Sequence, residues 1–200
     1  MKISKWIARL LLFVASVVIA ITISPFRFFY SPVVSELGYS YTVSSAAESP
    51  VQFPNNYKQQ FVHYVTVDCP TSGIVRQMYI DRPSLESLKA NETFPSGAVI
   101  VMETHSAKQG SDNRLIPTQL NNLFVREKRR GWNVAASGEW QSAWYSPSGS
   151  LVSGNQTSCI GCHTQVRDRD YLFTLPALQA AAKTGQTQHQ QTEFSTSVCR

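Results

Sequence analysis

The chain has 200 residues and a formal net charge of +5. Four of its eighteen Lys and Arg residues precede residue 31, and all thirteen Asp and Glu residues follow it, so the remainder is close to neutral. This balance excludes the concentrated basic surface that nucleic-acid binding requires. The local basic cluster at 126–132 is interrupted by Glu127 and is interpreted as a solvated, salt-bridged strand or turn. With both ends set aside, about 150 residues remain, enough for one domain with its own core.

The first 30 residues are typical of an export signal. Three basic residues within positions 1–9 precede an apolar run at 10–23, and such a start directs export from the cytoplasm. Because a membrane-spanning helix needs about 20 apolar residues, residues 6–23 fit either a cleaved signal sequence or a retained N-terminal membrane anchor. Residues 31–50 are Ser-rich and are interpreted as a linker. We predict a periplasmic or extracytoplasmic location, with anchoring to the inner membrane as an alternative.

Residues 51–184 are predicted to form the domain, and its first half indicates β-structure. Residues 61–68 and 74–80 are dense in aromatic and β-branched side chains, with Pro and Gly between them, which predicts two strands joined by a turn. Asp81 is placed to cap a short helix that follows. Residues 98–102 are apolar without alternation, which predicts a buried strand.

The second half of the domain is less regular. Residues 120–132 fit a helix pattern in part and a strand pattern in part, and residues 138–145 suggest a strand. Residues 175–185 begin with Leu-Pro and end with Gly, which predicts a helix. Residues 185–200 are rich in Gln, Thr and Ser and are predicted to be a disordered tail. The fold expected is mainly β (α+β), with an antiparallel sheet and a few short helices, one of them after residues 158–163.

The stretch Ser-Cys-Ile-Gly-Cys-His at 158–163 carries the strongest motif. On one turn of helix, Cys159 and Cys162 project from the same face, so both thiols can reach the vinyl groups of one porphyrin. His163 then follows at the position of an iron ligand. C-x-x-C-H is the pattern of c-type haem attachment, which takes place outside the cytoplasm. We predict one covalent haem c on Cys159 and Cys162, with His163 ligating the iron.

Other uses of the motif are less well supported. A structural zinc site needs four ligands, so Cys69, Cys199 or a distant His would have to complete it. A redox dithiol belongs near a βαβ pattern, and a disulfide between Cys159 and Cys162 closes a strained short loop. Whether Cys69 and Cys199 pair with each other is left open.

The position opposite His163 decides what the iron does. No Met follows the motif, and the upstream candidates Met102, His63 and His105 are more readily interpreted as core or surface residues. A five-coordinate iron is therefore predicted. An open iron binds small molecules, whereas a six-coordinate iron transfers electrons.

The chain resembles the cytochrome P-460 family, which includes the cytochromes c-prime-beta. The matching stretches run in order from about residue 55 to residue 174: NNYKQQFVHY, VRQMYID, FPSGAVIVMET, LFVREKRRGW, GEWQSAWYSPSG and CIGCHTQVRDRDYLFT. The resemblance implies an antiparallel sheet that covers a c-type haem, with five-coordinate iron and His163 as proximal ligand. One branch of the family oxidises hydroxylamine and has a lysine bonded to the porphyrin. The other branch binds nitric oxide under a Phe-lined cap.

This resemblance makes Lys89 the candidate for a haem crosslink, with an ordinary exposed helix lysine as the alternative. Hydroxylamine oxidation also needs a proton acceptor over the iron. Three carboxylates lie in the matching stretches, and none is assigned this role: Glu103, Glu127 and Glu139. Phe61 and Phe94 are candidates for the cap, or are simply core residues. A carbonyl or carboxylate is expected to accept the second ring N–H of His163.

The sequence thus predicts an exported mono-haem c protein that oxidises hydroxylamine or a related small nitrogen compound, with an electron-transfer partner that it does not identify. Two alternatives stay open. One is a non-catalytic binder of nitric oxide or a similar gas on the same scaffold. The other is a six-coordinate electron-transfer cytochrome.

Overall fold

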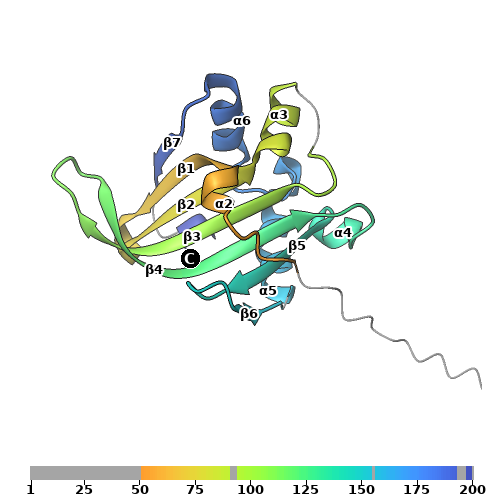
Figure 1. Cartoon of the computed structure of the whole chain (residues 1–200), viewed down its shortest axis with the longest axis horizontal. Helices are drawn as coiled ribbons and strands as arrows, with labels where there is room; N and C mark the ends of the chain where they lie inside the picture. Colours follow the sequence, from red (N-terminus) through yellow and green to blue (C-terminus); the bar gives the residue numbers. More distant parts are fainter. Residues whose placement is uncertain (1–50, 91–93, 155, 193–196, 200) are drawn as a thin grey trace, which may run out of the picture. The chain divides into compact units, whose positions relative to one another are not determined.

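The computed structural model describes residues 51–90, 94–154, 156–192 and 197–199. Within this part of the chain, seven strands form one sheet in the order β6-β5-β4-β3-β2-β1-β7 (Figure 1). Neighbouring strands are antiparallel except β1 and β7, which are parallel. The strands are β1 (Phe61–Cys69), β2 (Ile74–Asp81), β3 (Val99–Gln109), β4 (Leu115–Lys128), β5 (Trp140–Tyr145), β6 (Leu151–Ser153) and β7 (Gln188–Gln191). The predicted mainly β, α+β fold is confirmed.

Short helices complete the described part of the domain. The α-helices are α2 (Tyr57–Gln60), α3 (Arg82–Lys89), α4 (Val134–Ser137), α5 (Thr157–His163) and α6 (Leu175–Thr184). Three 3-10 helices are η1 (Pro70–Ser72), η2 (Thr164–Arg169) and η3 (Ser197–Cys199). Helices α3 and α6 contact each other and the β1 end of the sheet (Figure 1).

Helix α3 begins where the sequence predicts. Asp81 Oδ1 accepts a hydrogen bond from the backbone N–H of Ser84 at 2.9 Å, and Oδ2 accepts one from the N–H of Val99 at 2.7 Å. One carboxylate therefore caps the helix and fixes the start of β3. Loss of such a cap lowers the free energy of unfolding by about 1 kcal/mol.

The predicted helix at 175–185 is α6, which ends at Gly185 in a left-handed conformation with φ of 70°.

The centre of the sheet is buried on both faces. In β3, Ile100 packs in a core cluster that includes α6, whereas Val101 packs in a second cluster with Val51 and Tyr57. Successive side chains of a strand point to opposite faces, so a strand covered on both sides is apolar without alternation. This explains the unbroken apolar pattern of residues 98–102.

The ambiguous segment at 120–132 is resolved as a strand up to residue 128. Strand β4 pairs with β3 on one side and with β5 on the other. Pairing on both edges overrides the partial helix pattern, because strand formation depends mainly on neighbours in the sheet. Alternate side chains of β4, including Phe124, Arg126 and Lys128, therefore share one face.

The prediction of a disordered tail is wrong for the described residues after 184. Strand β7 pairs with β1 from Val65↔Gln188 to Asp68↔Gln191. A disulfide joins Cys69 to Cys199 with a Cα–Cα distance of 5.6 Å. An edge strand is held by its backbone hydrogen bonds and needs no apolar side chains, so composition alone indicated disorder.

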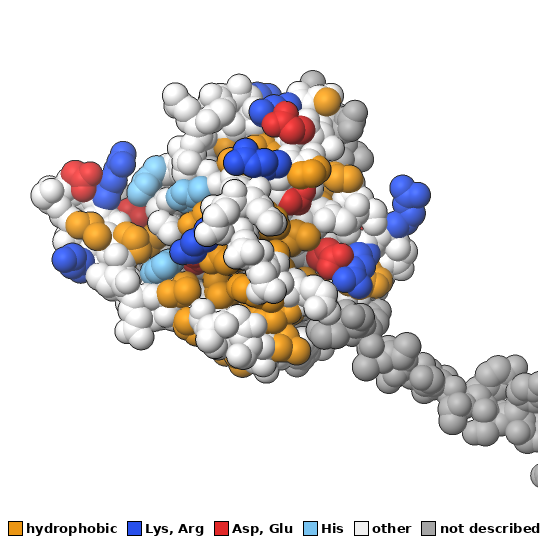
Figure 2. Space-filling model, viewed as in Figure 1, with side chains coloured by type: hydrophobic (Ala, Val, Ile, Leu, Met, Phe, Trp, Pro, Cys, Tyr) orange, Lys and Arg blue, Asp and Glu red, His pale blue; other side chains and the backbone are white. Residues whose placement is uncertain are grey.

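The face drawn in Figure 2 carries Lys and Arg side chains dispersed among neutral ones, several of them beside Asp or Glu (Figure 2). Ion pairs such as Arg129 with Glu127 at 2.6 Å balance the charge locally.

The predicted signal or anchor at 1–30 and the linker at 31–50 lie outside the described residues. Among the described residues, no helix has the length and apolar character needed to cross a membrane.

Candidate haem site

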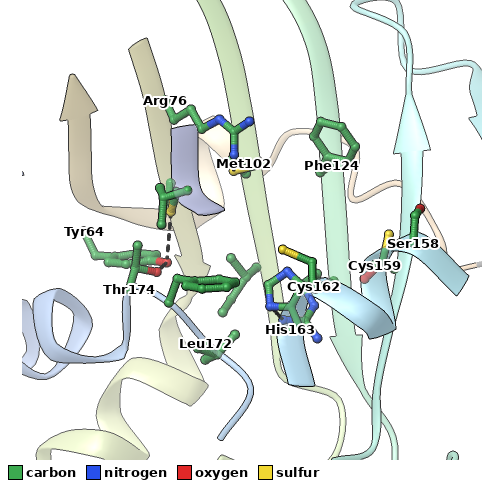
Figure 3. A pocket seen from close by; sticks show the side chains of 16 residues that line it. Tyr64, Arg76, Met102, Phe124, Ser158, Cys159, Cys162, His163, Leu172 and Thr174 are labelled. Carbon is green, nitrogen blue, oxygen red and sulfur yellow. Dashed lines mark hydrogen bonds between the residues drawn. The ribbon is translucent and has the colours of Figure 1, made fainter. Parts of the chain in front are cut away.

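A cavity of about 410 Å³ lies between the sheet and α5 (Figure 3). Its volume falls in the range of cofactor pockets, about 300–1,000 Å³. Strands β1 to β5 contribute one wall, and α5, residues 172–174 and η3 contribute the others. The lining residues are Tyr64, Arg76, Met78, Ile100, Met102, Phe124, Arg126, Ser142, Ser158, Cys159, Cys162, His163, Leu172, Phe173, Thr174 and Val198.

Helix α5 brings the three predicted haem-binding residues, two attachment cysteines and one iron ligand, into this cavity. Cys159 and Cys162 are one turn apart on α5, neither is in a disulfide and both are half-buried. His163 ends the same helix and lines the same cavity (Figure 3). The helical spacing inferred from the sequence is therefore present, and the two thiols and the imidazole face one space.

A turn between η2 and α6 supports His163. Asp170 and Tyr171 have positive φ angles of 47° and 58°, a conformation that non-glycine residues adopt rarely. The turn is held by Lys128 Nζ, which donates to both carboxylate oxygens of Asp170 at 2.7 Å. The backbone N–H of Tyr171 donates to the carbonyl of Val166 at 3.0 Å. As a result, the carbonyl of Tyr171 points at His163.

The carbonyl of Tyr171 lies 2.7 Å from His163 Nδ1. An imidazole that ligates a metal through Nε2 keeps its proton on Nδ1, so in that state Nδ1 donates and the carbonyl accepts. This bond fixes the ring orientation and leaves Nε2 for a ligand. The acceptor that the sequence could not identify is therefore a backbone group of Tyr171.

The imidazole of His163 is neutral over the physiological pH range. Burial and then the positive charge of Arg126 lower the pKa of His163 to about 3, although the hydrogen bond to the Tyr171 carbonyl acts in the opposite direction. A neutral imidazole has a free lone pair on Nε2, which is the form that binds metals. His163 is therefore in the protonation state that can coordinate a metal through Nε2.

Arg126 is the closest cation to His163 among the described residues. Its Nη1 lies 2.7 Å from both His163 Nδ1 and the Tyr171 carbonyl oxygen, and its guanidinium lies 5.2 Å from the ring centre of Trp140. Burial lowers the pKa of Arg126 to about 10, so the side chain is charged at neutral pH. A buried cation therefore stands beside the expected iron ligand.

Farther along the cavity wall, cationic, hydroxyl and thioether groups meet. Arg76 Nη1 lies 3.7 Å from Met102 Sδ, and burial lowers the pKa of Arg76 to about 10. Tyr64 Oη is 2.8 Å from Thr174 Oγ1 and 3.5 Å from Met78 Sδ. This part of the cavity offers hydrogen-bond donors within an otherwise apolar lining (Figure 3).

Of the three sixth-ligand candidates, Met102 lines the cavity, and His63 and His105 do not. His63 Nε2 lies 3.1 Å from the carbonyl of Val65. His105 Nε2 lies 2.8 Å from Glu103 Oε2. Both imidazoles therefore have partners away from the cavity.

The candidate catalytic side chains do not line the cavity in the described part of the chain. Lys89 lies at the end of α3, where its side chain is exposed and its Nζ donates to Glu86 Oε1 at 2.8 Å. Glu103 is fully buried, forms an ion pair with Lys58 at 2.8 Å and accepts a hydrogen bond from Tyr57 Oη. The Lys89 crosslink stays a prediction.

The other two carboxylates also have partners elsewhere. Glu127 pairs with Arg129, and Glu139 Oε1 accepts a hydrogen bond from the N–H of Gly131 at 2.8 Å. Neither lines the cavity.

The proposed aromatic cap is also placed differently. Phe94 packs edge-to-face on Trp140 with ring centres 5.4 Å apart, and Phe61 packs against the core cluster on the opposite face. The phenylalanines that line the cavity are Phe124 and Phe173. The ring of Phe173 lies 5.2 Å from that of His163.

The comparisons with known proteins agree with this site. The model of the family described as Cytochrome P460 matches residues 54–174, which is more than half of the chain and includes the whole C-x-x-C-H motif. No curated protein matches the chain. Members of the family are generally extracytoplasmic, and the family implies haem c binding. The chain belongs to the cytochrome P460 family.

Proposed function

We propose that this chain is an exported mono-haem c protein whose five-coordinate iron binds a small nitrogen compound or a gas such as nitric oxide. The observation that carries the proposal is that two thiols outside any disulfide and one oriented, neutral imidazole line a single cavity. The family match and the export-like N-terminus support it independently.

The residues present fit a c-type haem. Cys159 and Cys162 would each add S–H across a vinyl group, which forms a C–S bond and places the proton on the neighbouring carbon without any oxidant. His163 would supply Nε2 to the iron, held in place by the Tyr171 carbonyl. When bound, the haem would supply an iron centre that accepts a ligand and exchanges electrons.

Reversible ligand binding has the better support from the cavity. Its lining is mainly apolar, and the donors Tyr64 and Arg76 can stabilise partial negative charge on a bound molecule. Hydroxylamine oxidation remains the second candidate, because it is an activity of the family that the sequence resembles. That reaction releases protons and therefore needs a nearby acceptor.

The visible spectrum of the matured protein distinguishes these functions. A high-spin spectrum of ordinary haem c, together with nitric oxide binding by the ferrous protein, supports a gas binder. A strongly altered Soret band and turnover of hydroxylamine with an added electron acceptor support the enzyme. Sharp low-spin bands would contradict a five-coordinate iron and would point to Met102 as sixth ligand.

A control variant links the spectrum to the motif. We expect Cys159→Ser combined with Cys162→Ser to abolish covalent haem while the apoprotein stays folded. Retention of covalent haem in this double variant would contradict the attachment proposed here.

A further inference from the structure

We infer that Arg126 is a positioning residue that weakens electron donation from His163 to the iron, because it shares the Tyr171 carbonyl with the His163 Nδ1 proton. This inference rests on the proposed haem binding and goes beyond it, since it concerns what sets the properties of the iron. Neither the motif nor the family match assigns a role to Arg126.

The geometry around the carbonyl is a close triangle. Each of the three distances among Arg126 Nη1, His163 Nδ1 and the Tyr171 carbonyl oxygen is 2.7 Å. With Nε2 on the metal, Nδ1 carries a hydrogen and has no lone pair to accept one from Arg126. Arg126 must therefore donate to the carbonyl, which has two lone pairs and accepts both hydrogens.

The consequence follows from competition for one acceptor. A carbonyl alone draws the Nδ1 proton and makes the imidazole a more basic ligand. A guanidinium on the same oxygen removes electron density from it, so the pull on the Nδ1 proton is smaller. The positive charge beside the ring also opposes any imidazolate character. Both effects make His163 a weaker donor and favour the reduced iron.

The surroundings of Arg126 are unusual for a purely structural arginine. Its Nε is buried and has no hydrogen-bond partner among the described residues, whereas a buried guanidinium is normally satisfied by several acceptors. The position is fixed by the aromatic face of Trp140 and by the register of β4. Packing and strand register therefore hold the Arg126 guanidinium beside His163, although its Nε–H has no acceptor among the described residues.

The test uses the matured holoprotein and two variants that each remove one buried cation from the same cavity. Arg126→Gln keeps a donor for the carbonyl and removes the charge. Arg76→Gln is the matched control, because Arg76 also lines the cavity but its Nη1 lies beside Met102 rather than His163. Two quantities are measured: the one-electron reduction potential and the iron–histidine stretching frequency of the ferrous protein by resonance Raman spectroscopy.

For Arg126→Gln we expect at least a tenfold change in the reduction equilibrium toward the oxidised iron, which corresponds to a shift of about 59 mV to lower potential. We also expect a higher iron–histidine frequency. Arg76→Gln should leave that frequency at the wild-type value, even where loss of its charge lowers the potential. An unchanged iron–histidine frequency in Arg126→Gln, or an equal change of that frequency in both variants, overturns the inference.

Arg126→Lys provides a second route if Arg126→Gln does not mature. Lysine restores the charge and a donor, so its potential and frequency should stay near those of the wild type. A shift as large as tenfold in the equilibrium, in a folded Arg126→Lys protein, also overturns the inference. Haem-free wild-type protein, by contrast, would refute the proposed function itself.

Discussion

Substitution of Gly138 by Ala tests whether the turn that supports His163 is packed as tightly as the structure indicates. Gly138 has a φ of 58°, and a Cβ atom placed on it would lie 2.3 Å from two ring carbons of Tyr171. Normal carbon–carbon contacts are about 3.5–4.0 Å, so the ring must move by about 1.2–1.7 Å. Because Tyr171 also supplies the backbone carbonyl that lies against His163 Nδ1, the substitution disturbs the site as well as the fold.

The magnitude has two parts. A left-handed conformation costs a residue with a Cβ about 1–2 kcal/mol, and overpacking costs about 1–3 kcal/mol more. We therefore expect the free energy of unfolding to fall by about 2–5 kcal/mol. In a domain of this size, each kcal/mol lowers the melting temperature by about 2–4 °C.

Gly73→Ala is the matched control, because Gly73 has a similar φ of 63° and a Cβ atom placed on it would meet no atom within 4 Å. It should show the backbone cost alone. The assay is thermal unfolding of both holoproteins at one scan rate, followed by tryptophan fluorescence. If Gly138→Ala and Gly73→Ala destabilise equally, the close packing of Gly138 on Tyr171 is not real and the reasoning fails.

Three further expectations concern other parts of the domain. Burial alone would raise the pKa of the Glu103 carboxyl, but hydrogen bonds from Lys58, Tyr57 and His105 outweigh burial and lower the pKa below its usual value of 4.5. The ionised carboxylate therefore stabilises the folded protein above pH 4.5, and this stabilisation is lost as the pH falls through the folded-state pKa. Glu103→Gln should lower the free energy of unfolding by about 2 kcal/mol at pH 7, because hydrogen bonds to a charged group become weaker neutral ones while Lys58 stays largely solvated. It should also flatten the pH dependence of that free energy below pH 4.5, measured by denaturant titration; an unchanged profile would contradict this role. Replacing both Cys69 and Cys199 by Ser removes a disulfide that spans 130 residues. The free energy of unfolding, measured by denaturant titration, should fall by about 4 kcal/mol; an unchanged value would show that the disulfide does not form in the protein. Lys89→Ala should leave the visible spectrum of the holoprotein unchanged if the ion pair with Glu86 is its only role, and an altered Soret band would instead establish the crosslink.

The motif and the regular elements are readable from the sequence because each depends on local chemistry. The i, i+3 spacing of Cys159 and Cys162 places both thiols on one helix face wherever that helix packs. Asp81 caps α3 through a bond to a residue only three positions away. These features need no knowledge of distant contacts.

The rest of the site depends on contacts between residues far apart in the chain. Arg126 begins the charged run REKRR at 126–130, whose composition indicates a solvated segment, and only its register in β4 turns it inward toward His163, 37 positions away. The Tyr171 carbonyl is a backbone group with no residue signature. Likewise, β7 is held by its pairing with β1 and a disulfide across the domain, which composition cannot reveal.

The most direct test of the central claim is the mass of the peptide that contains residues 158–163 after digestion of the matured protein. We predict that this mass is increased by one haem, that the haem resists acid–acetone extraction, and that the increase is lost when both cysteines are replaced by serine. An unmodified peptide from protein expressed with a complete haem c maturation system would contradict it.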